Sequence, residues 1–442
     1  MPASPFDSEI YRDLLRDDEI ARRFDDAAVI GCWLRVEGAL AAAQGALGLI
    51  PEESARAIAS ACHNIEIDPA ELAVGTGRDG IPIPAFVDAL RTALDDPAHA
   101  NYLHFGATTQ DIMDTGLVLR LGEVCDIVDA RLVRLLQALA DLAERHAELP
   151  LAARTRRMPA TPTSFGAVVA AWGAPLLGER QALAQLRPRL LRVSLGGASG
   201  NSAALGPRAA ELREAFAREL GLDAGKGCWH SDRAPLAEFA SCLTRIAGLL
   251  AKMAEDCLLG AAPEVGELRF AGGGGSSTMP HKQNPVHAEA LSSLFQLAAA
   301  LAGAMTQALP HRQQRDGAAW MLEWLALPQL CSACGRALRL AEELLDGLEV
   351  EPARMHANLD GAHGLVYAEA ISFRLAHEMP RAEAQTLVKK WCAEAVAAER
   401  SLAEIAAEQF GEIDWTQIVN LAAQLGDAPE QARAFAARAR ES

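Results

Sequence analysis

The sequence predicts an all-α fold, with a long central helical bundle between small helical lobes at the two ends of the chain. Two observations support this prediction. Alanine and leucine dominate the 442 residues and aromatic residues make up only 5%, a composition that suits packed helices better than a β-sheet. Apolar residues also recur every three or four positions over long stretches, which is the period of an amphipathic helix.

The three predicted parts follow one another along the chain. The N-terminal lobe is expected over residues 1–103, where prolines such as Pro51 and Pro69 separate short helical patterns. The bundle is expected over residues 104–350, and the C-terminal lobe over residues 351–442. Asp111 and Asp114 lie where the first bundle helix should begin, because carboxylates cap free amides and suit the helix dipole there. The long apolar patterns cover residues 117–142, 164–186, 209–220, 236–259, 286–309 and 322–348.

One segment of the bundle has the length of a membrane span. Residues 290–309 carry no charged side chain, and about 20 apolar residues can cross a bilayer. The segment nevertheless contains Ser292, Gln296 and Gly303 among other polar or small residues. We therefore expect a helix that protein encloses on every side, and no membrane association.

The charge and the cysteines indicate the setting of the protein. A net charge of −17 argues against nucleic acid as a partner. The 9 cysteines are scattered, which predicts reduced thiols and a cytoplasmic location. Residues 1–23 contain no apolar stretch of the kind that an export signal has, so we expect no export by that route. Cys331 and Cys334 lie in a helical apolar pattern, so we expect them to pack in the core and not to hold a metal.

Four breaks between the helical patterns are rich in Gly, Ser, Thr and Pro. Polar loops on a rigid helical scaffold are where catalytic residues are expected. The four loops cover residues 104–110, 154–163, 195–207 and 271–285.

The loop 271–285 has the most informative sequence. Glycines at 272–275 precede Ser276 and Ser277, and Lys282 and Asn284 follow. A cation and an amide donor can stabilise an oxyanion. The spacing differs from that of the phosphate-binding loop of nucleotide hydrolases. The residues alone leave both a phosphate cradle and a mobile catalytic loop open.

Residues 275–284 resemble the signature Gly-Ser-Ser-x-Met-Pro-x-Lys-x-Asn of the aspartase/fumarase superfamily. Residues 104–111 and 196–206 are similar to two further motif regions of these proteins. The resemblance implies an all-α homotetramer whose active sites form where loops from three subunits meet. The sequence itself shows no apparent metal site and no dinucleotide-binding fingerprint, so we expect no cofactor.

The resemblance assigns roles to residues of this chain. Ser276 would transfer the proton on the carbon next to a substrate carboxylate. Lys282 and Asn284 would stabilise the resulting aci-carboxylate, in which the carboxylate carries two negative charges. For His104 we favour a catalytic role, and a structural hydrogen bond is the alternative. The implied substrate-binding residues are Thr108, Thr109, Asp111, Ser277, Met279 and Arg315, the last as a carboxylate clamp.

Several stretches are similar to the bacterial 3-carboxy-cis,cis-muconate cycloisomerase branch of the superfamily: residues 33–40, 80–84, 229–233, 314–324 and 357–364. The second motif departs from the common pattern Thr-His-x-x-Gln. Arg156 stands at the position of the His, which protonates the leaving group in many members. Met158 stands at the position of the Gln and has no explanation from the sequence. A carboxylate needs no such proton, so Arg156 fits cycloisomerisation as a residue that binds substrate.

The resemblance thus implies conversion of 3-carboxy-cis,cis-muconate, a polycarboxylate, to carboxymuconolactone in protocatechuate degradation. One alternative is a lyase that releases fumarate from a succinyl-type substrate, as adenylosuccinate lyase does. The other is a catalytically silent homologue with a structural or binding role. The presence of Ser276, Lys282 and Asn284 disfavours silence.

Overall fold

The computed structural model describes residues 4–271, 274–275, 278–279, 281–361 and 363–441. The chain divides into two compact units. The first unit comprises residues 1–130, 179–247 and 293–337, and the second comprises residues 131–178, 248–292 and 338–442.

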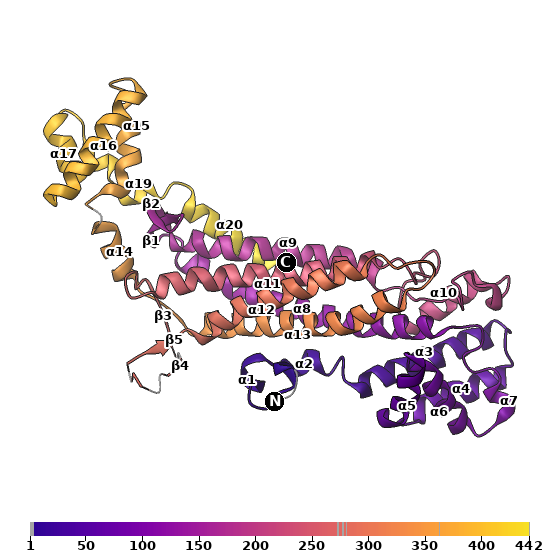
Figure 1. Cartoon of the computed structure of the whole chain (residues 1–442). Coiled ribbons are helices and arrows are strands. Elements are labelled where there is room, and N and C mark those ends of the chain that lie inside the picture. Colours follow the sequence, from indigo (N-terminus) through magenta and orange to yellow (C-terminus); the bar gives the residue numbers. More distant parts are fainter. Residues whose placement is uncertain (1–3, 272–273, 276–277, 280, 362, 442) are drawn as a thin grey trace. The chain divides into compact units, whose positions relative to one another are not determined.

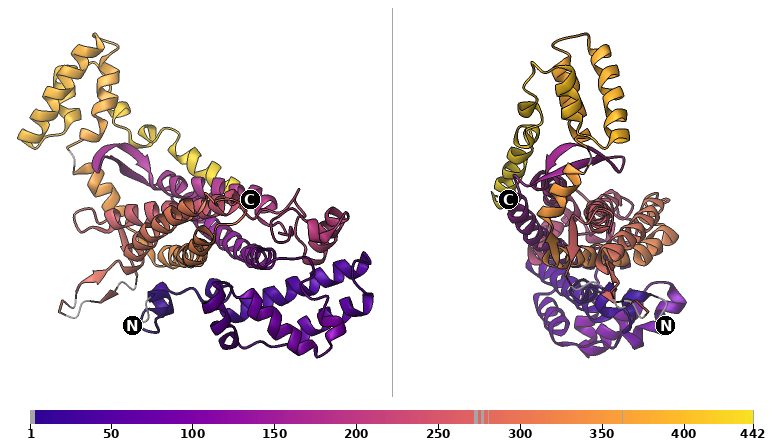
Figure 2. Two further views of the ribbon diagram at one scale, coloured as in Figure 1. Left: turned by 45° about the vertical axis from the view of Figure 1, so that its right-hand side comes forward. Right: turned by 90° about the vertical axis from the view of Figure 1, so that its left-hand side faces the viewer.

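Five long helices supply residues to both units, and within each unit their segments lie side by side (Figures 1 and 2). These helices match the predicted long patterns to within a few residues, and the all-α prediction is confirmed. The predicted division into 1–103, 104–350 and 351–442 differs from the two units, because each long helix contributes to both. The five helices are α8 Thr109–Arg145, α9 Phe165–Leu190, α11 Ala234–Ala261, α12 Val286–Ala308 and α13 Gly317–Asp346.

Helix α8 forms much of the core. In the first unit Leu121, Val124 and Val128 are fully buried, and in the second unit Leu132 and Leu139 are. Their spacing of three, four and seven residues gives one continuous apolar stripe. Cys331 and Cys334 on α13 are also fully buried, as expected for packing residues.

Short helices surround the long ones in the first unit. Helix α3 packs against α4 and α10 (Figure 1). Asp25 caps the start of α3 by accepting from the Ala28 amide at 2.8 Å. The short elements of this unit are η1 Pro5–Asp7, α1 Arg12–Leu15, α2 Asp18–Ala21, α3 Asp26–Ala46, α4 Glu52–Asn64, α5 Pro69–Asp79, α6 Ile83–Leu94, α7 Pro97–Ala100, η2 Ala203–Leu205 and α10 Ala209–Leu220.

The second unit contains the predicted C-terminal helices. Trp391, Ile371 and Leu402 share a small apolar core there. Its short helices are α14 Pro352–Asp360, η3 Leu365–Tyr367, α15 Ala368–Leu375, α16 Arg381–Ala398, α17 Leu402–Gln409, α18 Trp415–Ile418, α19 Leu421–Gln424 and α20 Ala428–Glu441. Its strands are β1 Pro150–Thr155, β2 Met158–Ser164, β3 Leu268–Phe270, β4 Gly274–Gly275, β5 Gln283–Asn284 and β6 Leu348–Val350.

The segment 154–163 is mostly a β-hairpin, not the polar loop that we expected from its sequence. Strand β1 pairs antiparallel with β2, from Pro150 opposite Ser164 to Thr155 opposite Met158. The tip consists of Arg156 and Arg157, with φ of 53° and 69°. Such a turn usually contains Asn-Gly, and prolines disfavour strands. The sequence therefore lacked the usual hairpin signal.

Helix α12 is not enclosed within its own chain. Leu297 on α12 is 37% exposed, and Gln296, Ala300 and Gly303 are also exposed. Both α12 and α11 have the length and apolar composition of a membrane span; half of the most apolar window is buried in α11 and a third in α12. The described residues therefore leave an uncharged face of α12 partly exposed.

Two glycines of α9 give a matched test of its packing. A Cβ at Gly166 would lie 2.4 Å from the Ala143 carbonyl oxygen and 2.6 Å from the Ala147 Cα, whereas a Cβ at Gly178 would meet nothing. Gly166→Ala should lower the free energy of unfolding by about 1–3 kcal/mol through overpacking. Gly178→Ala should raise it by about 0.5–1 kcal/mol. Urea denaturation measures the free energy of unfolding of both variants. Equal effects would contradict the close contact of Gly166 with Ala143 and Ala147.

Candidate active site

The buried carboxylate of Asp111, in the first turn of α8, joins two of the predicted loops in the first unit. Asp111 is 1% exposed. It accepts from the backbone amides of Gly196 at 3.0 Å and Gly197 at 2.9 Å. It also accepts from the Thr108 amide at 3.0 Å, which stabilises the helix start. The loops 104–110 and 195–207 are therefore held together at the N-terminus of α8.

The close approach of these loops requires glycine. Gly197 has φ of 70°, and a Cβ there would lie 2.9 Å from the Gly106 carbonyl oxygen. Gly106 has φ of 75°, and a Cβ there would lie 2.7 Å from Leu205 Cδ2. Both positions combine a left-handed backbone with a lack of space.

Arg315 brings a third segment to the same place. Its Nε donates to Gln110 Oε1 at 2.9 Å, and its Nη2 donates to Thr108 Oγ1 and to the Ala198 carbonyl oxygen, both at 3.3 Å. All three acceptors are neutral, so among the described residues these contacts leave the charge of the half-buried guanidinium without a carboxylate. A planar guanidinium in this state, beside the positive end of a long helix, suits a bound carboxylate.

His104 is oriented by a buried acid. Its Nδ1 lies 2.6 Å from Glu37 Oε1, and Glu37 is 1% exposed. Burial opposes the charge on His104, but Glu37 outweighs this effect and raises the pKa of the imidazole. His104 also has φ of 57°, a conformation that costs a non-glycine residue free energy. A contact through Nδ1 leaves Nε2 as the nitrogen that could meet a ligand.

His230 is the fourth partner of Asp111. Its Nε2 lies 2.8 Å from Asp111 Oδ1, and the residue is 3% exposed. Burial opposes protonation of this imidazole, but Asp111 and the neighbouring Cys228 sulfur outweigh burial and raise the pKa of His230 to about 9. In turn, the His230 imidazole lowers the pKa of the Cys228 thiol. Imidazolium and carboxylate together form a rigid support under the loops.

A buried ion cluster lies behind this support. The Arg233 guanidinium donates to Asp114 Oδ2 at 2.6 Å and to Glu323 Oε1 at 2.8 Å, and all three side chains are 1–2% exposed. Gln110 Nε2 donates to Asp114 Oδ2 at 3.1 Å and to the His230 carbonyl oxygen at 2.9 Å. Gln110 thus connects the cluster to Arg315.

The second unit holds the described part of the loop 271–285. Gly274 pairs with Asn284, and Gly275 with Gln283, so the loop is closed at its base by β4 and β5. Lys282 is exposed and Asn284 is half-buried, just before the N-terminus of α12. Met279 is 41% exposed.

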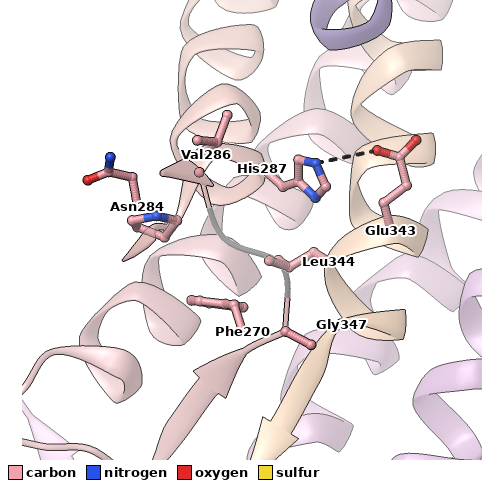
Figure 3. A pocket seen from close by; sticks show the side chains of 10 residues that line it. Phe270, Asn284, Val286, His287, Glu343, Leu344 and Gly347 are labelled. Carbon is pink, nitrogen blue, oxygen red and sulfur yellow. Dashed lines mark ion pairs between the residues drawn. The ribbon is translucent and has the colours of Figure 1, made fainter. Parts of the chain in front are cut away.

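Asn284 lines a small pocket of the second unit (Figure 3). The pocket has a volume of about 60 Å³ and is also lined by Phe270 and by His287, which is ion-paired with Glu343 at 3.8 Å. This volume holds on the order of a few water molecules and is too small for a tricarboxylate. The pocket by itself does not account for substrate binding.

Arg156 and Met158 lie at and beside the tip of the β1–β2 hairpin, and both are exposed; Met158 is 67% exposed. The neighbouring Arg154 behaves differently. It forms a bidentate ion pair with the buried Glu267, at 2.7 and 2.8 Å. Arg154 therefore anchors the hairpin, and Arg156 presents its charge to its surroundings.

The structure thus brings together part of the predicted site. Thr108, Asp111 and Arg315 are connected by hydrogen bonds in the first unit. His104 lies in the same loop as Thr108 and contacts Glu37, and Thr109 is half-buried in the first turn of α8. The four satisfied contacts of Asp111 favour a positioning role over direct substrate contact. Lys282, Asn284, Met279 and Arg156 belong to the second unit. Ser276 and Ser277 lie outside the described residues. Over the described ranges, no group of three or more His, Cys, Asp or Glu residues could hold a metal ion.

The sequence analysis missed Gln110, Cys228, His230 and Arg233. A signal for two of them was present, because the stretch Trp-His-Ser-Asp-Arg at 229–233 was noted as a resemblance but given no role. In the structure Trp229, His230 and Arg233 all point inward and are at most 5% exposed.

Comparison with known proteins places this site in a family. A family model described as lyase matches residues 13–299. The chain belongs to this family and is an enzyme of the aspartase/fumarase superfamily.

Several relatives share nearly the whole chain. The 3-carboxy-cis,cis-muconate cycloisomerase of Pseudomonas aeruginosa is 41% identical, over 94% of this chain and 92% of that protein. The crystal structure of the 3-carboxy-cis,cis-muconate lactonizing enzyme from Pseudomonas putida matches with a TM-score of 0.91 and 35% identity, over 98% and 99% of the two chains. A nitrosuccinate lyase of Streptomyces davaonensis is 36% identical, over 91% of this chain and 88% of that protein.

The raised pKa of His230 predicts a pH-dependent stability. A group whose pKa rises from 6.5 to about 9 on folding stabilises the protein fully below pH 6.5 and loses this contribution as the pH rises through 9. A Cys228→Ala background removes the opposing titration of the thiol and also part of the rise in the His230 pKa, so that Asp111 alone raises it. In this background the free energy of unfolding should still fall as the pH rises above 6.5, by on the order of 1–2 kcal/mol. Urea denaturation at several pH values measures it.

His230→Gln in the same background provides the control. It should remove the fall, because glutamine keeps a polar contact with Asp111 but does not titrate. An unchanged pH profile would show that His230 is not the titrating group.

Proposed function

We propose that the protein is a cycloisomerase that converts 3-carboxy-cis,cis-muconate to carboxymuconolactone. The observation that supports this most directly is Arg315, whose guanidinium is fixed by Gln110 and Thr108. Its hydrogen-bond acceptors among the described residues are all neutral. It offers a carboxylate site at the N-terminus of α8. The relatives that share the family and nearly the whole length support the choice of substrate.

The reaction needs a nucleophile, an electron sink and a proton. One substrate carboxylate adds through oxygen to the distant carbon of a double bond, and a C–O bond forms as the C=C π bond breaks. The electron pair moves to the carbon next to another carboxylate. That carboxylate delocalises the pair and is then in the aci-carboxylate form. Ser276 would then give its hydroxyl proton to that carbon and recover one from solvent.

The other proposed site residues would stabilise the negative charges of the substrate and of the intermediate. Lys282 and Asn284 would stabilise the dianionic intermediate, and His104 and Arg315 would fix the other carboxylates. Arg156 fits this reaction because the nucleophile is a carboxylate and no leaving group needs protonation. The exposed position of Arg156 at the hairpin tip allows it to meet a ligand or a neighbouring subunit.

One relative supports an alternative within the same family. The nitrosuccinate lyase is 36% identical to the chain, so an elimination from a succinyl-type substrate would use the same proton transfer and the same carboxylate site. The departure at Arg156 and the higher identity to the cycloisomerase favour cyclisation.

The assembly that we propose is a cytoplasmic homotetramer with shared active sites. The resemblance to the superfamily supports this assembly, and the uncharged face of α12 is partly exposed among the described residues. The cysteines that the structure describes are present as thiols, which suits a reducing compartment. Neither nucleic acid nor a membrane is part of this proposal.

The activity is tested with the purified enzyme and three substrates. We expect consumption of 3-carboxy-cis,cis-muconate without added metal or nucleotide, and no fumarate release from adenylosuccinate or nitrosuccinate. Ser276→Ala should lower kcat on the order of 100-fold or more, since a positioned proton donor contributes at least that much. Absorbance of the muconate measures the rate.

Ser277→Ala is the matched control and should have a smaller effect on kcat. A larger effect of Ser277→Ala would move the proton transfer to that residue. Efficient release of fumarate from either succinyl compound by the unmodified enzyme would favour the alternative instead.

The assembly is tested at Leu297, which the chain leaves 37% exposed on α12. Leu297→Glu should lower the molar mass seen by light scattering from tetramer to smaller species, because a charge buried between subunits without a partner is costly. Leu259→Glu, at a residue that is 39% exposed on α11, controls for the added charge. A tetramer that survives the Leu297 change would place the interface elsewhere.

A further inference from the structure

The first unit contains a cavity that the proposed reaction does not use. It has a volume of about 210 Å³ and lies between the start of α3, the first turns of α8 and the first half of α13. Its walls include the aromatic side chains of Phe24, Trp33, Trp320 and Trp324. An apolar cavity of about 150 Å³ is known to hold benzene, so this one can hold a single substituted ring.

Arg120 lines the same cavity and has an unusual environment for a buried cation. It is 8% exposed. Its Nε donates to the Gly116 carbonyl oxygen at 3.2 Å, and its guanidinium carbon lies 5.5 Å from the centre of the Phe24 ring. Among the described residues it has no carboxylate partner.

The electrostatics of Arg120 agree with its geometry. Burial lowers the pKa of the guanidinium, and the groups that oppose this effect are the thiols of Cys32 and Cys331, which are uncharged at neutral pH. A buried charge without a counter-ion is costly. An anion that entered the cavity beside Arg120 would remove this cost.

The two acids that also line the cavity, Asp114 and Glu323, form hydrogen bonds with residues other than Arg120. Asp114 accepts from Arg233 and from the Trp320 indole at 3.1 Å, and Glu323 accepts from Arg233 and lies 3.3 Å from His311 Nε2. Arg233, which does not line the cavity, therefore neutralises both carboxylates. Among the described residues the cavity therefore offers Arg120, a cation without a carboxylate partner, and an aromatic interior.

We propose that this cavity is a second ligand site, which binds a small aromatic carboxylate with its ring among Phe24, Trp33 and Trp324 and its carboxylate on Arg120. The ligand is bound and not turned over, because no proton donor or nucleophile of the proposed reaction lines the cavity. The proposal does not depend on which substrate the active site converts.

Benzoate is the probe, and isothermal titration calorimetry of the full-length enzyme is the measurement. We expect saturable binding with a Kd on the order of 0.1–1 mM, as suits a ligand of this size. Benzamide, which has the same shape without the charge, should bind about 10-fold more weakly, since hydrogen bonds between charged groups are stronger than neutral ones. Quenching of tryptophan fluorescence should follow the same isotherm.

Three variants locate the site. Arg120→Met should weaken benzoate about 10-fold and abolish the preference over benzamide. Arg145→Met, at an exposed position of the same helix, removes an equal charge and should leave binding unchanged. Arg315→Met should also leave it unchanged, which separates this site from the active site.

Phe24→Leu is a second probe that keeps the charge and shortens the aromatic wall, so that the test survives if Arg120→Met does not fold. It should weaken benzoate and benzamide alike. The proposal is overturned if benzoate shows no saturable binding, if it binds no better than benzamide, or if Arg315→Met and not Arg120→Met removes it.

Discussion

A single buried carboxylate, that of Asp111, determines the arrangement of the active-site loops in the first unit. It accepts from three backbone amides and faces the His230 imidazolium. Hydrogen bonds to a charged group are about twice as strong as neutral ones, so the three segments that it joins behave as one body. Arg315 gains its position from this support through Thr108, whereas His104 is oriented separately by Glu37.

The cations of the molecule differ in how their charges are used. Arg154 and Arg233 lie against buried carboxylates and hold the fold. Arg315 is held by neutral acceptors, which fixes its direction without neutralising it. In a chain with a net charge of −17, a polyanionic substrate is repelled at long range. Cations that are held by neutral acceptors, as Arg315 is, act together with helix N-termini to make its binding possible.

The sequence predicts the scaffold well because the long helices follow a simple period. The signal of α8, for example, is a regular stripe from Leu121 to Leu139 that any core-facing helix must have. The hairpin was missed because its turn is formed by Arg156 and Arg157, which carry no turn signal. The resemblance supplied Arg315 and His104, but it could not supply the partners that fix them. His230, Glu37 and Gln110 lie far from their partners in the sequence or differ little from ordinary polar residues, so only the folded chain reveals them.

The ion cluster of Arg233, Asp114 and Glu323 has a consequence for how this sequence can evolve. Asp114 lies on α8, Glu323 lies on α13 and Arg233 directly precedes α11, and each side chain is almost fully enclosed. Removing one partner of a buried ion pair costs about 3–5 kcal/mol, whereas replacing the whole set by apolar residues can be neutral. A protein in which only one of the three residues is substituted is thus destabilised, and only simultaneous changes at all three avoid this loss of stability. Lineages that diverge in substrate should therefore retain these three residues together or lose them together.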